Sequence, residues 1–516
     1  MDNLSAVPAT GHESRRIAVN SGYLLIAYMV ESLLSIVLLG LVARYLDQAG
    51  FGRYGYAISF VELFIMITEL SSSRVLVREI ASDLQNARRV LANVWTLRLV
   101  TSTGTILAVA LAARMQAVDP QVFWSIVLFA IGQVFYVLAD VFNSVFRAHQ
   151  QMRYQTMTIV LGQVLVVSMC AGSMALGLGL VALFGARAVA NFVRMLYAWY
   201  LCRKRFIPER LSDDLRGMWF ILRESFPVAV YLVLHRLMWR GGIVVMTTQL
   251  NREAPGQGDL AAGLLYGPLR LVEQMRVVPS SLVGAILPVF SRQARAEPER
   301  FRANLSKSGK LFVTLSVLLA LMISILARPI TRMVLGGGLE GSAQVLAVFA
   351  CVIVFTFPNQ LIETALMSLG RQSVVAIGLG LGVVVGMAAS WLYFVPAYQG
   401  MGVAFGIMLA EGITFVVGVA VLLPYLNRRE WAAVLAKLAL SALATGAVMF
   451  GLRDRLWFVL VGLLGLITFG AANLLLRTFT PGELEAIATL VLFPRRLHFI
   501  RRWLFRKGSA STPDGA

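Results

Sequence analysis

Six arginines lie inside long apolar stretches of the sequence, where charged side chains are uncommon. They are Arg187, Arg194, Arg236, Arg240, Arg270 and Arg276. An arginine at the centre of a lipid bilayer costs about 2.5 to 3.5 kcal/mol even on insertion scales, so we expect these residues to face protein or water. Arg187 and Arg194 fall on one helical stripe, and Arg236 and Arg240 lie one turn apart. Stacked guanidinium groups suit an anionic head group. The alternatives are ion pairs with Glu273 for Arg270 and Arg276, and side chains that reach to the membrane surface.

Carboxylates also occur within the apolar stretches. The candidates for binding a coupling ion, either a proton or sodium, are Glu31, Glu62, Asp140, Glu273, Glu363 and Glu411. A carboxyl group held away from water can load and release an ion as its surroundings change. Glu31 is the clearest candidate, because it sits near the middle of the first stretch. A salt bridge to one of the arginines is the alternative for each of them.

The sequence contains no pattern typical of a disulfide framework, a metal site or a nucleotide-binding loop. The three cysteines stand apart, and the four histidines do not cluster. Gly336-Gly337-Gly338 lacks the lysine and the serine or threonine of a phosphate-binding loop. We therefore predict no catalytic residues, no metal and no cofactor. The net charge of +19 is expected to mark a membrane face that contacts anionic lipid, and we predict no nucleic-acid partner.

The elements that must position these side chains are apolar segments long enough to cross a membrane. The chain has 516 residues, of which 58% are hydrophobic. Fourteen stretches have the length and continuity of membrane helices. They cover residues 21–44, 54–74, 95–113, 122–146, 155–176, 179–202, 224–249, 260–288, 310–329, 342–368, 372–395, 400–424, 432–451 and 456–476. The sequence predicts an all-α integral membrane protein.

The basic residues between the stretches alternate in number from one gap to the next. One set of gaps contains roughly four times as many arginines and lysines as the other. Positive loops stay in the cytoplasm, so both termini are expected to be cytoplasmic. The sequence from Arg495 to Lys507 mixes basic and large apolar residues, which predicts an amphipathic helix on the inner leaflet. A disordered basic tail is the alternative.

A repeat is visible six stretches apart. Tyr54-Gly55, Glu62 and Ser71-Ser72-Ser73 in the second stretch correspond to Tyr266-Gly267, Glu273 and Ser280-Ser281 in the eighth. An even offset keeps both copies in the same orientation, which is typical of transporters with two parallel repeats. Pro268, Pro279 and Pro288 predict bends in the eighth stretch.

Several short motifs resemble one family of transporters. They are Ala43-Arg44-Tyr45-Leu46, Gly50-Phe51-Gly52-Arg53-Tyr54, Val77-Arg78-Glu79-Ile80-Ala81, Phe146-Arg147-Ala148, Glu224-Ser225-Phe226-Pro227, Tyr266-Gly267-Pro268-Leu269-Arg270-Leu271 and Leu287-Pro288-Val289-Phe290-Ser291. In order and spacing, over residues 20–426, the chain resembles the polysaccharide transport branch of the multidrug/oligosaccharidyl-lipid/polysaccharide (MOP) exporter superfamily. Members of this branch often have an acidic residue beside the arginine in the seventh helix. Here Arg236 is followed by Leu237 and Met238, which puts a coupling-ion role for that helix in doubt.

The resemblance implies a MATE-like fold with about 14 transmembrane helices. Two six-helix bundles would be related by a parallel pseudo-two-fold axis, with two further helices at the C-terminus. The expected divisions are a cytoplasmic N-terminal segment (1–20), an N-lobe (21–203), a linker (204–223), a C-lobe (224–426), the last helix pair (427–476) and a basic tail (477–516).

The resemblance also implies a function. A flippase would move polyprenyl-pyrophosphate-linked oligosaccharide across the bacterial cytoplasmic (inner) membrane for O-antigen, capsule or exopolysaccharide synthesis, by alternating access and without enzymatic chemistry. Its expected partners are the lipid-linked substrate, membrane lipids, H⁺ or Na⁺, and a glycan polymerase with export machinery. A multidrug antiporter and a membrane-embedded polymerase are the alternatives. Six intramembrane arginines disfavour the first, and the short outward gaps disfavour the second.

Overall fold

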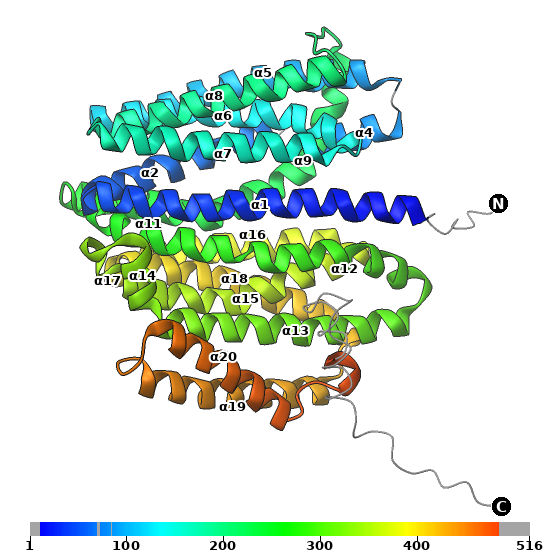
Figure 1. The fold of residues 1–516 in the computed structure, drawn as a ribbon, viewed down its shortest axis with the longest axis vertical. Helices are drawn as coiled ribbons and strands as arrows, with labels where there is room; N and C mark the ends of the chain where they lie inside the picture. The colour runs from blue at the N-terminus through cyan, green and yellow to red at the C-terminus, as the bar shows by residue number, and fades with distance from the viewer. Residues whose placement is uncertain (1–10, 70–72, 84, 485–516) are drawn as a thin grey trace, which may run out of the picture.

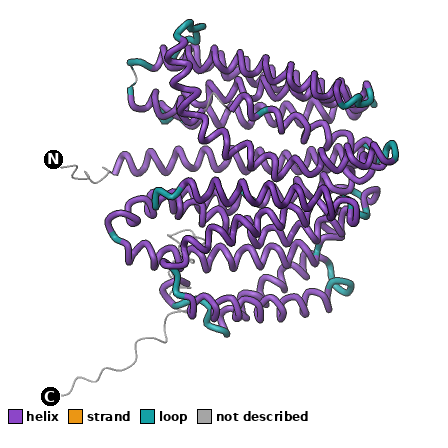
Figure 2. Tube along the Cα trace, turned by 180° about the vertical axis from the view of Figure 1, so that it is seen from behind, coloured by secondary structure: helices purple, strands orange, loops and turns teal. Residues whose placement is uncertain are grey.

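The computed structural model describes residues 11–69, 73–83 and 85–484, and these residues form helices joined by short loops (Figure 2). No strand occurs within these ranges, in agreement with the all-α prediction. The segment from Arg495 to Lys507, for which an amphipathic helix was predicted, lies outside the described residues.

The first half of the chain forms one bundle, in the upper part of Figure 1. Its helices are α1 (Gly11–Tyr45), α2 (Gln48–Phe64), α3 (Met66–Glu69), α4 (Ser73–Ser82), α5 (Ala87–Met115), α6 (Pro120–Ala148), α7 (Met152–Ala175) and α8 (Gly179–Arg205). Helix α1 runs through the middle of the molecule, between this bundle and the second one.

Most of the second half forms the bundle below α1, whereas its first helix, α9 (Leu215–Arg236), lies above α1 in Figure 1 and contacts α5. The helices that follow α9 are η1 (Leu237–Gly241), α10 (Gly242–Glu253), α11 (Gln257–Met275), α12 (Val277–Ala296), α13 (Pro298–Ile325), α14 (Ala327–Leu335), η2 (Gly337–Leu339), α15 (Ser342–Ser368), α16 (Gln372–Ala389), η3 (Ser390–Phe394), α17 (Val395–Tyr398), α18 (Gly400–Leu422) and η4 (Leu423–Tyr425). Helices α19 (Arg428–Leu452) and α20 (Phe458–Leu475) pack on the outside of α13, as the predicted appended pair.

The packing repeats between the two bundles. Helices α4 and α5 both contact α6, and α7 packs on α8; in the second half, α12 and α13 both contact α15, and α16 packs on α18. Helices α2 and α11 pack directly against each other where the bundles meet. The predicted fold of two parallel six-helix bundles with a C-terminal pair is confirmed.

The exact count of fourteen spans is not confirmed. Twelve helices among the described residues are long and apolar enough to cross a membrane. The second and eighth predicted spans are missing from this set because each is broken: α2 ends at Phe64 before α3, and α11 ends at Met275 before α12. Pro279 has no N–H to donate to the carbonyl of Met275, which fits the second break.

Several helices begin earlier than hydropathy predicts. Helix α1 begins at Gly11, α5 at Ala87, α9 at Leu215 and α13 at Pro298, against expected starts at 21, 95, 224 and 310. Each of these additional segments contains basic residues, which lower its mean hydropathy, and the helix continues through them. Hydropathy detects the apolar part of a helix only.

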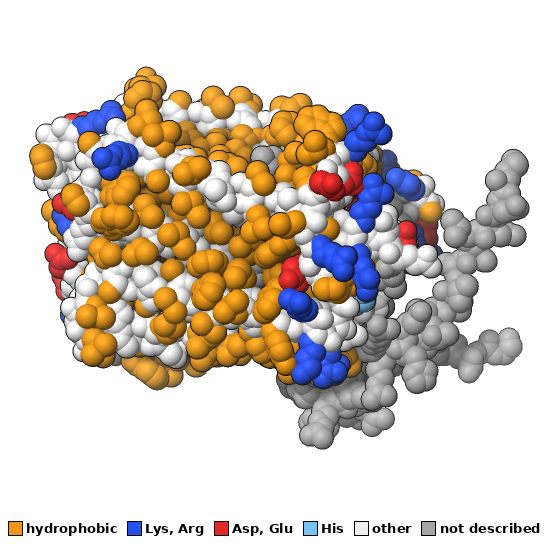
Figure 3. Space-filling model, turned by 90° about the horizontal axis from the view of Figure 1, so that it is seen from above, with side chains coloured by type: hydrophobic (Ala, Val, Ile, Leu, Met, Phe, Trp, Pro, Cys, Tyr) orange, Lys and Arg blue, Asp and Glu red, His pale blue; other side chains and the backbone are white. Residues whose placement is uncertain are grey.

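Basic side chains gather at one end of the molecule, with an apolar band between the two ends (Figure 3). This is the end at which α1 begins (Figure 1), and we call it the basic end. Helix α8 ends there with Arg203, Lys204 and Arg205.

Candidate functional site

A cavity of about 770 Å³ lies between the two bundles. Its wall is contributed by α1, α2, α6, α7 and α8 from the first half, and by α9, α11 and α12 from the second. The lining residues are Leu25, Tyr28, Glu31, Ser32, Ser35, Glu62, Gln133, Tyr136, Gln163, Val166, Arg187, Asn191, Arg194, His235, Arg236, Arg270, Glu273, Gln274, Arg276, Val277, Ser280 and Ser281. Five arginines and three glutamates leave this wall with two positive charges in excess.

Close packing of α2 on α11 closes the end of the cavity away from the basic end. A Cβ atom added to Gly52 would lie 1.8 Å from the carbonyl oxygen of Asp259, so the two backbones touch. A Cβ atom added to Gly263 would lie 2.1 Å from the carbonyl oxygen of Gln48. Arg53 forms an ion pair with Asp259 at 2.8 Å across the same contact. The cavity lies beyond this contact, on the side of the basic end, where α2 and α11 present Glu62 and Glu273.

The equivalent residues of the repeat meet at this crossing. The Tyr54 and Tyr266 rings stand edge to face with their centroids 5.9 Å apart. Glu62 and Glu273 both contact the guanidinium of Arg240. Arg240 is 1% exposed and is absent from the cavity wall. Its charge is therefore neutralised beneath the cavity floor, in the paired arrangement that the sequence allowed as an alternative.

Arg270 and Arg236 belong to the same ion-pair cluster but also line the cavity. Arg270 lies 2.8 Å from Glu273 and 3.9 Å from Glu62, and Arg236 lies 3.9 Å from Glu62. Three arginines thus share two carboxylates, which leaves one positive charge in excess. A π-helical turn, η1, re-aims Arg240 toward α2 and α11 just after α9 has presented Arg236 to the cavity.

Two arginines of the wall have no acidic partner among the described residues. The guanidinium of Arg187 lies over the ring of Phe129, 5.1 Å from its centroid, and that of Arg276 lies 5.0 Å from the centroid of Trp239. The buried Nε atoms of both side chains make no hydrogen bond within the described part of the chain. Arg187 comes from the first half, and Arg276 sits at the break between α11 and α12.

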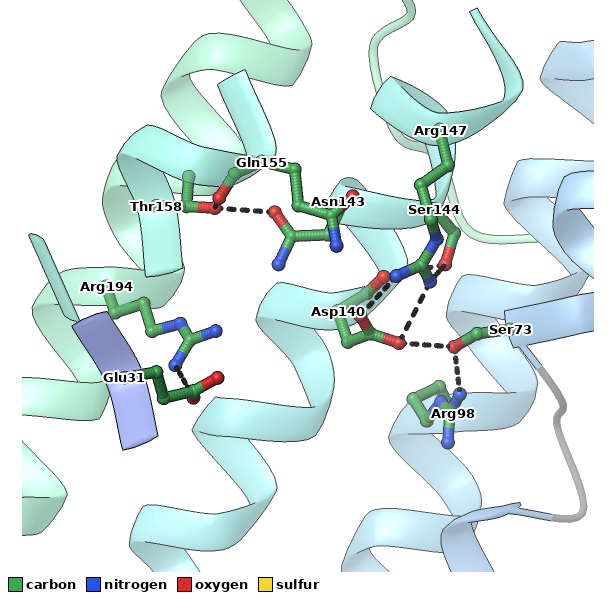
Figure 4. Close-up of polar contacts among 10 residues, drawn as sticks. All are labelled: Glu31, Ser73, Arg98, Asp140, Asn143, Ser144, Arg147, Gln155, Thr158 and Arg194. Atoms are coloured by element: carbon green, nitrogen blue, oxygen red, sulfur yellow. Dashed lines mark hydrogen bonds and ion pairs between the residues drawn. The ribbon is translucent and has the colours of Figure 1, made fainter. Parts of the chain in front are cut away.

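Arg194 faces Glu31 across the first-half wall, 4.0 Å away, as Figure 4 shows. Its guanidinium also lies over the ring of Tyr136 at 4.4 Å. Gly162 makes room for this side chain, because a Cβ there would lie 2.3 Å from the arginine Cδ. Glu31 thus lines the cavity and forms an ion pair with one arginine, whereas Glu62, the other first-half candidate in the wall, pairs with three.

The remaining acidic candidates lie outside the cavity wall. Asp140 accepts a hydrogen bond from Ser73 at 2.7 Å and pairs with Arg147 at 3.3 Å (Figure 4). In the second half, Glu363 accepts from the hydroxyl of Tyr231 at 2.8 Å, and Glu411 accepts from Asn359 at 2.6 Å. Each of these carboxylates has a local polar partner within its own half.

Sequence reasoning missed the uncharged part of the wall. Gln133 and Tyr136 on α6, Gln163 on α7 and Gln274 on α11 all line the cavity. Their signal was a polar side chain within an apolar stretch, with Gln133 and Tyr136 three residues apart on one helix face. No metal-binding group of three or more His, Cys, Asp or Glu side chains was found in the described ranges.

Paired broken helices, a central cavity lined by polar and charged side chains, and two parallel bundles define a membrane transporter of the MATE-like fold. The model of the family described as "Polysaccharide biosynthesis protein" matches residues 17–294, which is more than half of the chain. The chain therefore belongs to this family, within the MOP superfamily. The family model "Lipid II flippase MurJ" matches residues 276–483.

Solved structures with the same fold are known. The lipid II flippase MurJ in an inward closed conformation is 13% identical, with a TM-score of 0.69 over 88% of this chain and 98% of that one. An inward-facing multidrug resistance MATE transporter of the MOP superfamily is 17% identical, with a TM-score of 0.60 over 77% and 94%. A MOP superfamily transporter from Pyrococcus furiosus, described as having a binding pocket of reversed polarity, is 16% identical, with a TM-score of 0.56 over 80% and 96%. No curated protein matches the sequence significantly.

Proposed function

We propose that this protein is a flippase for polyprenyl-pyrophosphate-linked oligosaccharide in a bacterial cytoplasmic membrane. The cargo would serve the assembly of an O-antigen, capsule or exopolysaccharide. The membership in a polysaccharide biosynthesis family and the similarity to a lipid II flippase both support this class of cargo. In this proposal the N-lobe (21–203) and the C-lobe (224–426) rock against each other, and the basic end with both termini faces the cytoplasm.

The observation that carries the proposal is the pair of unpartnered arginines, one from each half. Arg187 and Arg276 face one cavity, and neither forms an ion pair within the described part of the chain, so a pyrophosphate would supply a counter-charge at direct contact. Arginine binds phosphate oxygens with two parallel hydrogen bonds, which are among the stronger ones in proteins. Arg194, Arg236 and Arg270 would add long-range attraction, whereas Arg240 would hold the floor together.

The remaining parts of the cargo fit the same geometry. Phosphates and sugars cannot cross hydrocarbon, and a hydrated cationic cavity removes that barrier. A multidrug antiporter for cationic compounds would need an acidic or aromatic wall, whereas this wall is positive by two charges. A glycan polymerase and export machinery would act on the product after its crossing.

The proposal is tested with the full chain in proteoliposomes. Polyprenyl-pyrophosphate-linked oligosaccharide is placed in both leaflets, and its accessibility to an added glycosidase is followed over time. We expect wild-type protein to expose the inner-leaflet pool much faster than protein-free vesicles do. Equal rates, together with efflux of a cationic dye, would favour the antiporter instead.

Ion coupling is the finer part of the proposal, and Glu31 is its first candidate. Its carboxylate lines the cavity 4.0 Å from Arg194, and release of this arginine to a phosphate would coincide with uptake of a proton or sodium ion. We expect imposed H⁺ or Na⁺ gradients to change the rate for wild type, and Glu31→Gln to abolish that dependence. An unchanged gradient dependence in Glu31→Gln would transfer the role to Glu363 or Glu411.

A further inference from the structure

The two halves of the cavity wall differ in chemistry. The second-half wall displays Arg236, Arg270 and Arg276, and its carboxamide Gln274 already accepts a hydrogen bond from Ser32 at 2.8 Å. The first-half wall also displays carboxamides from three neighbouring helices: Gln133 of α6, Gln163 of α7 and Asn191 of α8.

The carboxamides differ in whether their side chains already hydrogen-bond to other residues. Gln163 donates a hydrogen bond to Ser35 at 3.1 Å, which fixes its position. Gln133 and Asn191 line the cavity, and neither side chain hydrogen-bonds to another residue of the described ranges. Asn191 is buried, with 2% of its surface exposed, and it lines the cavity.

These amides stand next to the phosphate-binding groups. Asn191 lies four residues after Arg187 and three before Arg194 on one face of α8. One helical turn rises about 5.4 Å, which is comparable to the size of one monosaccharide. Gly132 lets α6 approach α8 at Ala188, because a Cβ on this glycine would lie 3.0 Å from the Ala188 Cα. This contact brings Gln133 beside the same turn.

From this arrangement we infer that Gln133 and Asn191 form a sugar subsite for the monosaccharide attached to the pyrophosphate, and so determine which glycan is accepted. This inference rests on the proposed function. A sugar hydroxyl both donates and accepts hydrogen bonds, and a carboxamide also does both without adding charge. A site that hydrogen-bonds a ligand hydroxyl strongly disfavours ligands without that hydroxyl, because their binding leaves buried polar groups of the site unpaired.

The test measures binding of two probes to the purified full chain. One probe is polyprenyl pyrophosphate without sugar, and the other is the same lipid with a single hexose. We expect the hexose to raise wild-type affinity at least tenfold, since about two hydrogen bonds are added. Gln133→Met and Asn191→Leu should each lose about tenfold for the hexose probe and stay within about twofold for the bare one. Gln257→Met, at the exposed start of α11, is the matched control and should change neither.

The outcomes separate the inference from the function on which it rests. If wild type binds both probes equally well, the sugar subsite is refuted and the flippase proposal stands. Equal weakening of both probes by the variants would also overturn the subsite, because the amides would then act on the phosphates or the fold. If wild type binds neither probe, the proposed function itself fails. The wild-type comparison needs no variant, so poor folding of Asn191→Leu would leave the test intact.

Discussion

Each half of the molecule has a serine hydrogen bond at the equivalent place beside a helix break, but the acceptor is a carboxylate in the first half and a carboxamide in the second. In the first half, Asp140 of α6 accepts from Ser73, the first residue of α4, at 2.7 Å. In the second half, Gln360 of α15 accepts from Ser280, in the first turn of α12, at 2.8 Å. Both bonds tie the helix after a break to the central helix of its bundle.

The surroundings of the two bonds differ. Asp140 is an ion that also binds Arg147, and Arg98 donates to Ser73 at 3.1 Å, which makes a charged network (Figure 4). The Gln360 bond is neutral, and Ser280 faces the cavity. The duplicated fold therefore keeps one hydrogen bond beside each break. The bond in the first half belongs to a charged network, and the bond next to Arg276 is neutral. The following variants test this difference, beginning with the crossing on which both halves depend.

Arg240→Ala should have the largest effect. It removes the cation shared by Glu62 and Glu273 and leaves two buried carboxylates near each other. Breaking a buried ion pair on one side costs about 3 to 5 kcal/mol. Thermal unfolding in detergent should show this loss. Arg332→Ala, an exposed arginine paired with exposed Glu340, should leave the midpoint unchanged. A midpoint for Arg240→Ala equal to that control would mean that the crossing does not depend on the shared cation.

Gly52→Ala should separate α2 from α11. The added methyl would overlap the backbone of Asp259, with no flexible side chain to yield. Overpacking of this kind costs about 1 to 3 kcal/mol. Gly172→Ala, whose Cβ would have nothing within 4 Å, is the control. We expect a lower unfolding midpoint for Gly52→Ala, and also faster labelling of a cysteine placed beside the crossing; unchanged labelling would show that this contact is not a seal.

Asp140→Ala and Gln360→Ala compare the two ties directly. We expect Asp140→Ala to cost about 1 to 3 kcal/mol, because it removes a charge-assisted bond and the partner of Arg147. Gln360→Ala should cost about 1 kcal/mol, because a neutral bond is lost. Chemical denaturation measures both. Equal costs would contradict the contrast between a charged bond in the first half and a neutral bond in the second.

Acidification should loosen the attachment of the last helix pair. Burial alone would raise the pKa of the Glu483 carboxyl, but the Thr480 N–H and the Lys310 ammonium hold this pKa below its usual range. A carboxylate with a lowered pKa in the folded state stabilises the protein above its unfolded pKa, and this contribution fades as the pH falls through the folded value. We expect wild type to lose this contribution as the pH falls from 6 to 3. Glu483→Gln should be less stable at pH 6 and show a smaller loss on acidification; identical pH profiles would contradict the assignment.

Much of the architecture follows from the sequence. Apolar length predicted the helices, and the Tyr-Gly and Glu positions of the repeat predicted two equivalent halves. The contact between Tyr54 and Tyr266 where the halves cross was not predicted. The broken second and eighth helices were not predicted, because hydropathy averages across a break. Prolines suggested a bend near the right place, yet α11 continues through Pro268 and ends only at Met275.

The site was predictable in composition but not in pairing. Charged side chains within membrane helices avoid lipid and face protein or a cavity. Five of the six arginines line one cavity. Their partners lie far apart in sequence: Arg240 binds Glu62 across 178 residues. No local pattern identifies such a pair, and only the fold separates the neutralised Arg240 from the unpartnered Arg187 and Arg276.

The most direct measurement is the affinity of the full chain for bare polyprenyl pyrophosphate, compared among Arg187→Ala, Arg276→Ala, their double variant and Arg332→Ala. If one arginine from each half holds the phosphates, each single change should weaken binding by at least about tenfold, the double change should weaken it further, and Arg332→Ala should match wild type. Wild-type affinity in the double variant, with an unchanged unfolding midpoint, would contradict the account.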